Sequence, residues 1–409
     1  MEAPVGIASG SSHTAAGPTP PALVLDSLRK RFGDFTAVDG VDLEVPRGEF
    51  VTLLGPSGSG KTTTLRMIAG FMTPDEGTIR IAGDEMTRVP AHRRDVGMVF
   101  QNYALFPHMT AAQNIAFPLQ MRNVPRDEQR QRIAEALDLV KLSTFGDRYR
   151  RQLSGGQQQR IALARAIVFR PRLLLMDEPL GALDKKLREA LQLEILRISR
   201  QLGATVVYVT HDQEEALVMS DRIAIFDKGR IQQLGTGEDL YERPTSVFVA
   251  DFVGESNMLR GRLERDADGT WLQRGTWRWR VDPIVAGAPG LRDGEPAALV
   301  VRPEHLRVVA VDAALDGANS IDATVTEVLY LGPTRKIELA LPDGVAAVVR
   351  EPAGTAGDWR PGDQVRLEWA VERAVVVPDP AVDESATAAT DDPLAPLDPD
   401  EVASSGSAS

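Results

Sequence analysis

Three continuous apolar runs constrain the fold of this chain most strongly. They are "FVTLL" at 50–54, "RLLLMD" at 172–177 and "TVVYVT" at 205–210, and charged residues stand only at their ends. Strands that are buried on both faces of a parallel sheet have this pattern, because neither face meets water. Helical patterns at 126–140 and 184–203 lie between the runs. The alternation predicts an α/β fold with a parallel sheet.

A different pattern follows residue 257. In "WRWRV" (277–281) Trp and Val alternate with Arg, and in "VRLEW" (365–369) Val, Leu and Trp alternate with charged residues. Alternation with a period of two, broken by Gly, Pro and Asp, is typical of short strands with one buried face. We predict an α/β domain over 22–256 and a small antiparallel β-domain over 257–378.

Composition sets further limits. Residues 1–21 and 379–409 are rich in small residues and Pro and offer little to bury, which predicts a disordered leader and a disordered acidic tail. The 409 residues include no cysteine, which excludes disulfides, and no stretch of 18 apolar residues that could span a membrane. The net charge of −12 argues against nucleic acid as a partner, because phosphates would be repelled.

One segment has the spacing of a phosphate-binding loop. "GPSGSGKT" (55–62) matches G-x-x-x-x-G-K-[ST], and it lies between the apolar run at 50–54 and a helical pattern. Glycines let the backbone N–H groups approach phosphates closely. Lys61 would then neutralise the β- and γ-phosphates, and the Thr62 hydroxyl would bind Mg²⁺.

Polar side chains follow the apolar runs where ligands bind in open α/β sheets. Asp177 ends "LLLMD" and is predicted to hold Mg²⁺, while the adjacent Glu178 is placed to polarise an attacking water. His211 follows "TVVYVT" and could hydrogen-bond the γ-phosphate. Gln101 follows "VGMVF" and could contact Mg²⁺ or the water. The alternative for the acidic pair is a structural cap of the next turn, and for His211 a surface position.

A second anion-binding pattern, "LSGGQ" at 153–157, is predicted to open a helix. The N–H groups and the positive dipole end of a helix start attract an anion. Because the loop at 55–62 already encloses one side of a nucleotide, we predict that this motif closes the site of a second, identical chain. Two nucleotides would then be buried across a two-fold interface.

Together these residues resemble the ATP-binding subunit of an ATP-binding-cassette (ABC) importer, over roughly 22–378. The motifs that carry the resemblance, in the family's order, are Phe32 in "RKRFG", "GPSGSGKTT", "VFQNYALFPHMT", "LSGGQ", "LLLMDEP" with "LGALD", and "VTHDQEEA". The resemblance implies a P-loop NTPase cassette with a helical subdomain, followed by a small all-β domain of the oligomer-binding (OB) type. It also implies ATP and Mg²⁺ as cofactors and ATPase activity coupled to solute transport.

The same resemblance implies roles for single residues. Phe32 would stack on adenine, where the family more often has Tyr or Trp. Glu178 and His211 would drive hydrolysis, with Gln101 sensing the γ-phosphate, and Asp184 would couple the two sites of the dimer. The residues implied in nucleotide contact are Gly55, Ser57, Gly58, Ser59, Gly60, Lys61, Thr62 and Thr63 on one chain and Ser154, Gly155, Gly156 and Gln157 on its partner. Thr62, Gln101 and Asp177 would hold the metal.

The C-terminal half extends the resemblance to importers. "VRPEHLRV" and "VTEVLYLGPTRKIELAL" resemble the family's β-domain, which serves dimerisation or regulation, and "SVFVADFVGESNMLRG" resembles the spermidine/putrescine branch. Ferric iron, sugars and glycerol phosphate stay open as solutes, and a non-transport ABC ATPase is a distant alternative. The implied partners are two permease subunits and an extracytoplasmic solute-binding protein. The implied location is the cytoplasmic face of the membrane.

Overall fold

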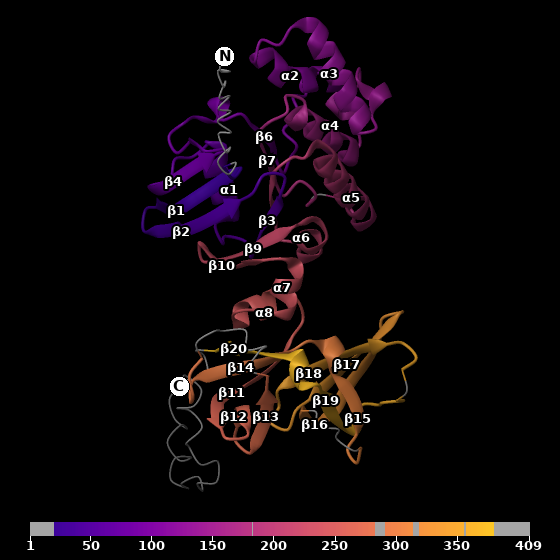
Figure 1. Cartoon of the computed structure of the whole chain (residues 1–409). Helices are drawn as coiled ribbons and strands as arrows, with labels where there is room; N and C mark the ends of the chain where they lie inside the picture. Colours follow the sequence, from indigo (N-terminus) through magenta and orange to yellow (C-terminus); the bar gives the residue numbers. More distant parts are fainter. Residues whose placement is uncertain (1–19, 182, 283–290, 314–318, 356, 380–409) are drawn as a thin grey trace, which may run out of the picture. The chain divides into compact units, whose positions relative to one another are not determined.

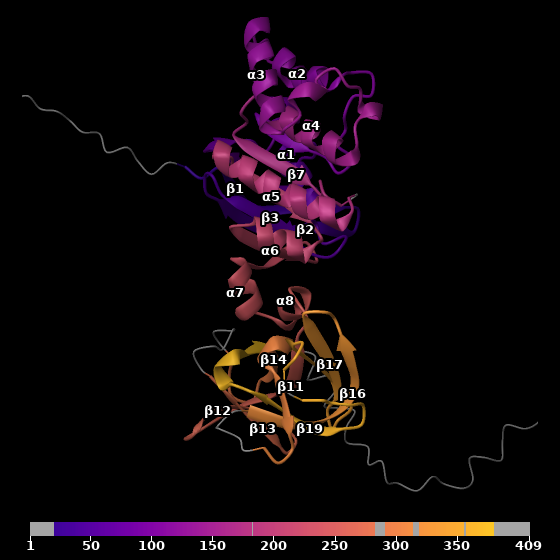
Figure 2. The ribbon, with the colours of Figure 1, turned by 90° about the vertical axis from the view of Figure 1, so that its right-hand side faces the viewer.

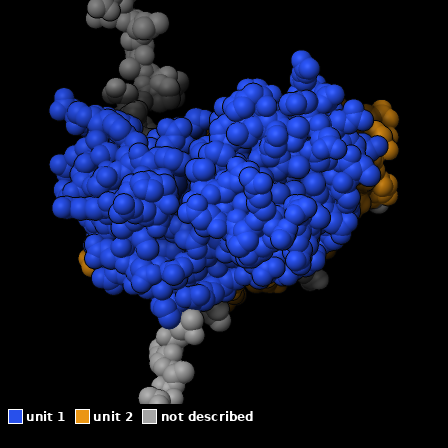
Figure 3. All heavy atoms as spheres, turned by 90° about the horizontal axis from the view of Figure 1, so that it is seen from above, with its two compact units in different colours: residues 1–237 blue, residues 238–409 orange. Residues whose placement is uncertain are grey.

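The computed structural model describes residues 20–181, 183–282, 291–313, 319–355 and 357–379. The chain divides into two compact units, residues 1–237 and 238–409, which Figure 3 colours separately. The split precedes the boundary that we predicted after residue 256. The predicted leader and tail lie outside the described residues, except for residues 20, 21 and 379. No helix in the described ranges is long and apolar enough to cross a membrane.

The first unit contains two sheets (Figure 1). An antiparallel sheet has the order β2-β1-β4-β5, and a six-stranded sheet has the order β10-β9-β3-β8-β7-β6. The strands are β1 (Leu23–Phe32), β2 (Phe35–Val45), β3 (Phe50–Leu54), β4 (Glu76–Ile81), β5 (Asp84–Glu85), β6 (Val96–Val99), β7 (Leu173–Asp177), β8 (Val206–Thr210), β9 (Arg222–Asp227) and β10 (Arg230–Gly235). Neighbouring strands from β9 to β6 are parallel, and β10 pairs antiparallel with β9. The predicted parallel sheet is therefore confirmed.

The described residues of this unit also form six α-helices. They are α1 (Lys61–Ala69), α2 (Ala111–Met121), α3 (Arg126–Leu139), α4 (Gly155–Ile167), α5 (Lys185–Leu202) and α6 (Gln213–Met219). Helices α2, α3 and α4 gather at one end of the unit in both ribbon views (Figures 1 and 2). The predicted helices at 126–140 and 184–203 are α3 and α5, and the predicted helix start at "LSGGQ" is that of α4.

The central strands are buried on both faces, as their apolar runs predicted. In β7, Leu173 and Leu175 pack in a core with α1 and the antiparallel sheet. Leu174 and Met176 face a second core with residues of α2 to α5. Alternate residues thus join two cores, and no residue of the strand can be polar until it ends at Asp177. This placement puts the first polar side chains at the strand ends.

The second unit contains two antiparallel sheets, of order β13-β12-β11-β14-β20 and β15-β19-β16-β17-β18. Its elements are α7 (Gly237–Glu242), α8 (Val247–Phe252), β11 (Asn257–Asp266), β12 (Gly269–Arg274), β13 (Trp277–Val281), β14 (Pro296–Val301), β15 (Arg307–Ala310), β16 (Asn319–Tyr330), β17 (Thr334–Ala340), β18 (Ala346–Pro352), β19 (Gln364–Trp369) and β20 (Ala374–Pro378). Both sheets share one core, in which Trp279 and Trp369 lie 6.4 Å apart between ring centroids. The predicted antiparallel β-domain is confirmed.

Candidate functional site

The glycine-rich loop connects β3 to α1, as its sequence context predicted. A Cβ atom at Gly55 would lie 2.2 Å from Phe226 O, and one at Gly60 would lie 2.4 Å from Ala37 O. Gly60 also has a left-handed φ of 103°, which disfavours a side chain. It begins α1 without a side-chain cap, so the first-turn N–H groups of the helix are available to an anion.

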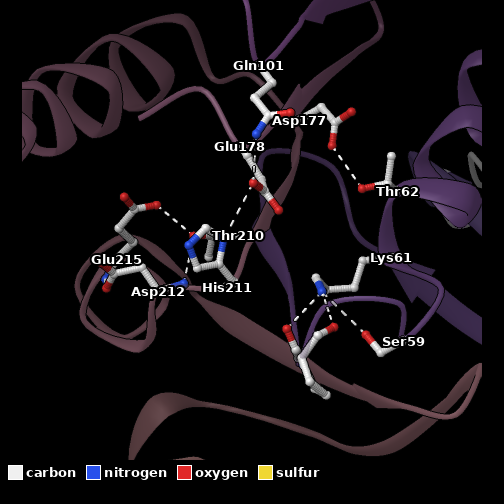
Figure 4. Close-up of polar contacts among 12 residues, drawn as sticks. Ser59, Lys61, Thr62, Gln101, Asp177, Glu178, Thr210, His211, Asp212 and Glu215 are labelled. Atoms are coloured by element: carbon white, nitrogen blue, oxygen red, sulfur yellow. Dashed lines mark hydrogen bonds and ion pairs between the residues drawn. The ribbon is translucent and has the colours of Figure 1, made fainter. Parts of the chain in front are cut away.

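Lys61 is held over this loop and is only 5% exposed. Its Nζ donates hydrogen bonds to Gly55 O and Pro56 O at 2.8 Å each and to Ser59 Oγ at 3.3 Å (Figure 4). Burial lowers the pKa of Lys61, while the nearby carboxylates of Glu178 and Asp177 oppose that shift. The Lys61 ammonium is therefore held against two carbonyl oxygens of the loop.

Two adjacent carboxylates stand at the end of β7. Asp177 is 8% exposed and accepts a hydrogen bond from Thr62 Oγ1 at 3.2 Å. Burial raises the pKa of Asp177, and the bond from Thr62 opposes the rise. Glu178 has a left-handed φ of 42°, an unfavourable conformation for a residue with a side chain. Its backbone N–H still donates to Val209 O at 3.0 Å, so the strained residue is fixed by the sheet.

Gln101 and His211 both approach one oxygen of Glu178 (Figure 4). Gln101 Nε2 donates to Glu178 Oε2 at 3.1 Å, and His211 Nδ1 lies 3.4 Å from the same oxygen. The His211 side chain is 59% exposed, whereas that of Glu178 is 22% exposed. The strand ends of β6, β7 and β8 thus bring an amide, a carboxylate and an imidazole together around one atom.

A buried network that the sequence did not suggest lies behind His211. Glu215 of α6 is 2% exposed and accepts hydrogen bonds from Tyr208 Oη at 2.7 Å and Thr210 Oγ1 at 2.8 Å. Burial raises the pKa of Glu215, and the two hydroxyl donors oppose the rise. Asp212 caps α6, and Arg188 of α5 donates to Asp212 at 2.8 Å. The network fixes both flanks of His211. Its only sequence signal is the acidic "HDQEEA" after a strand.

Replacing Glu215 by Ala is expected to destabilise the first unit by about 2–4 kcal/mol, because two buried hydroxyls lose their shared acceptor. Far-UV circular dichroism during urea unfolding checks this, with Glu214→Ala as the control. Glu214 is exposed, and its partner Lys185 lies 4.0 Å away, so a change below about 0.5 kcal/mol is expected there. All five tryptophans lie in the second unit, so the unfolding transition followed by tryptophan fluorescence should not move. Equal effects of the two variants would contradict the role given to Glu215.

A pocket of about 320 Å³ joins the loop, Glu178 and the predicted base-stacking residue. Its lining residues are Phe32, Phe35, Ala37, Ser57, Gly58, Ser59, Gly60, Lys61, Thr62, Thr63 and Glu178. Phe32 ends β1 and is 48% exposed; Phe35 begins β2, pairs with it across a tight turn and is 61% exposed. Phe35 was not among the residues predicted from the sequence. Its signal was the turn "FGDF", which places two aromatic rings at one hairpin end.

The "LSGGQ" residues begin α4 and are not among those lining this pocket in the described structure. Ser154 caps the helix: Ser154 N donates to Gln157 Oε1 at 2.9 Å, and Gln157 N donates to Ser154 Oγ at 3.3 Å. Ser154 and Gly155 are exposed, whereas Gly156 is buried, and a Cβ there would lie 3.3 Å from Leu187. Asp184 is exposed and caps α5 through Leu187 N at 3.0 Å.

Comparison with known proteins assigns the class. The family described as ABC transporter matches residues 38–181, and the family described as TOBE domain matches residues 299–377. Curated relatives are 46–48% identical over most of the chain. The chain therefore belongs to the ATP-binding proteins of ABC transporters, with a C-terminal TOBE domain, as its motifs indicated.

These three relatives share the name "Spermidine/putrescine import ATP-binding protein PotA". That of Rubrobacter xylanophilus is 48% identical, covering 88% of this chain and 94% of the relative. That of Thermobifida fusca is also 48% identical and covers 91% of this chain and 97% of the relative. A solved structure, the dimeric bacterial ABC transporter cassette MJ0796, is 34% identical, with a TM-score of 0.48 over 52% of this chain and 98% of that chain.

Proposed function

We propose that this chain is the ATP-hydrolysing subunit of an importer for the polyamines spermidine and putrescine. The observation that carries the ATPase part is the convergence of the loop cation Lys61 and the paired carboxylates with Gln101 and His211 at one sheet edge. The polyamine part is supported by the names of relatives that align with nearly the whole chain.

The pocket supports a nucleotide pose. Phe32 and Phe35 offer exposed rings to the base, and stacking of a base on an aromatic ring is worth about 1–3 kcal/mol. The N–H groups of residues 57–63 and the ammonium of Lys61 would receive the phosphates. No three His, Cys, Asp or Glu side chains cluster as a metal site among the described residues. Mg²⁺ typically uses one or two carboxylates together with substrate phosphates, so Asp177, Thr62 and Gln101 fit as its protein ligands.

In the proposed reaction, Glu178 accepts a proton from the attacking water as the water oxygen bonds to the γ-phosphorus. The bond from that phosphorus to the β–γ bridging oxygen breaks, giving ADP and inorganic phosphate. Gln101 and His211 hold the Glu178 carboxylate in place. Asp177, Thr62 and Gln101 would hold Mg²⁺, which would supply positive charge at the phosphates, and Lys61 would add its own.

A homodimer with ATP at its interface completes the proposal. The exposed Ser154 and Gly155 lie outside their own pocket, so a second chain would have to receive them. Permease subunits would bind the ATPase at the cytoplasmic face of the membrane, and an extracytoplasmic solute-binding protein would deliver the polyamine.

Uptake of labelled spermidine and putrescine tests the solute. Cells that lack the chain are complemented with the wild type or with Glu178→Gln, and only the wild type is expected to restore uptake. Labelled ferric iron and maltose serve as comparison solutes. Polyamine uptake that is unchanged by loss of the chain, with ATPase activity intact in the purified protein, would contradict the polyamine assignment but leave the ATPase.

A further inference from the structure

The loop after Gln101 contains two consecutive non-glycine residues in the left-handed region. Tyr103 has a φ of 62° and Ala104 a φ of 45°. Side chains disfavour this conformation, so it persists only where the surroundings hold it. Tyr103 N donates to Phe100 O at 2.8 Å, which closes a turn around Gln101. The backbone direction of Gln101 therefore depends on how Tyr103 is held.

Arg165, in the last turns of α4, holds both strained residues. Its Nη2 donates to Tyr103 O at 2.8 Å and its Nη1 to Ala104 O at 2.7 Å. The guanidinium also lies 5.8 Å from the ring centroid of Phe106. Two bonds from one planar fork define a position and an orientation, which a single donor cannot do.

The strand that leads into Gln101 touches the same part of α4. A Cβ atom at Gly97 in β6 would lie 2.4 Å from Ala166 O, so the helix and the strand are in close contact there. Beyond the strained pair, Asn114 of α2 accepts from Phe106 N at 2.8 Å and fixes the end of the loop. Gln101 is thus placed between two contacts with α4, one before it and one after it.

We propose that Arg165 is a positioning residue: its fork on the Tyr103 and Ala104 carbonyls sets Gln101 against Glu178 and ties the helix begun by Ser154 to the site of hydrolysis. The proposal rests on the proposed ATPase function. The distance of 3.1 Å between Gln101 and Glu178 depends on this tie, so a displacement of α4 is transmitted to the proposed base.

Arg165→Lys tests the fork, because lysine keeps the charge but cannot bind both carbonyls in one plane. We expect kcat for ATP to fall by roughly 10- to 100-fold, the scale for a misplaced catalytic group, with KM changed by less than about threefold. In a Gln101→Ala background the same substitution should change kcat by less than about twofold, because the group that it positions is gone. Adding Ala104→Gly to Arg165→Lys should recover part of the rate, since glycine adopts a φ of 45° without strain.

Arg160→Lys is the matched control on the same helix. Arg160 pairs with Glu194 at 2.6 Å instead of holding the loop, so its replacement should leave kcat within about twofold in both backgrounds. Amide hydrogen exchange gives a readout without turnover: residues 100–106 should exchange faster in Arg165→Lys but not in Arg160→Lys. If Arg165→Lys does not fold, Arg165→Gln, which keeps one donor group, replaces it in the same tests.

Two outcomes would overturn the proposal. One is an equal loss of kcat from Arg165→Lys with and without Gln101, which would indicate a general structural role. The other is unchanged exchange at residues 100–106. A wild-type chain that hydrolyses no ATP would overturn the proposed function itself, which separates that failure from a failure of the fork alone.

Discussion

Glu178→Gln is expected to lower the rate of ATP hydrolysis by about 10²–10⁴-fold, the range for removal of a positioned general base. The amide is isosteric but cannot accept the proton of the attacking water. Binding of ATP should persist, because Lys61 and the loop N–H groups are unchanged. Two chains that bind ATP without hydrolysing it should stay associated, so size-exclusion chromatography with ATP should show a lasting dimer.

Glu214→Gln is the control for this prediction. Glu214 lies three residues from His211 and its side chain is exposed, so this variant replaces a carboxylate by an amide outside the site. Its rate of ATP hydrolysis should stay within about twofold of the wild type. A Glu178→Gln variant that hydrolyses ATP at nearly the wild-type rate would show that another group accepts the proton. Loss of ATP binding together with activity would indicate instead that Glu178 supports the fold of the loop at the end of β7.

Ser154→Arg is expected to abolish ATP-driven dimerisation and to reduce hydrolysis by about 100-fold or more, because each site would lose the donors supplied by its partner. The arginine adds bulk and positive charge at the exposed start of α4, where the helix dipole favours an anion. Binding of a fluorescent ATP analogue to the monomer should be retained, because Ser154 does not line the pocket of its own chain.

Thr110→Arg controls for loss of the helix cap. Thr110 caps α2 with Gln113 in the same reciprocal arrangement, with bonds of 2.8 and 3.3 Å, so both variants lose a cap worth about 1 kcal/mol. When the purified chain is studied without permease subunits, only Ser154→Arg should prevent ATP-driven dimerisation. Normal dimerisation of Ser154→Arg would contradict the cross-subunit arrangement, and equal loss in both variants would assign the effect to helix stability.

Much of the site could be predicted because its residues follow local rules. The run "LLLMD" is apolar until the strand ends, so Asp177 and Glu178 had to emerge at the sheet edge. The loop at 55–62 combines a spacing that wraps phosphates with a strand before it and a helix after it. The two β-domain strands "WRWRV" and "VRLEW" were predictable from alternation alone, because one face is buried and the other meets water.

Other site residues could not be predicted, because their roles depend on packing between distant segments. Arg165 reaches carbonyls 61 and 62 residues away, and nothing in "LARAI" indicates that loop. Glu215 resembles its exposed neighbour Glu214, and only burial against Tyr208 distinguishes the two.

The sequence by itself determined the fold class, the phosphate loop and the polar residues at the strand ends, because backbone geometry and apolar periodicity act over a few residues at a time. Only the tertiary structure decided that Gln101 and His211 meet at one oxygen of Glu178, and that Arg165 holds a strained turn beside them. These contacts exist because close packing brings distant backbone carbonyls and side chains within hydrogen-bonding distance, and packing is a property of the whole folded unit.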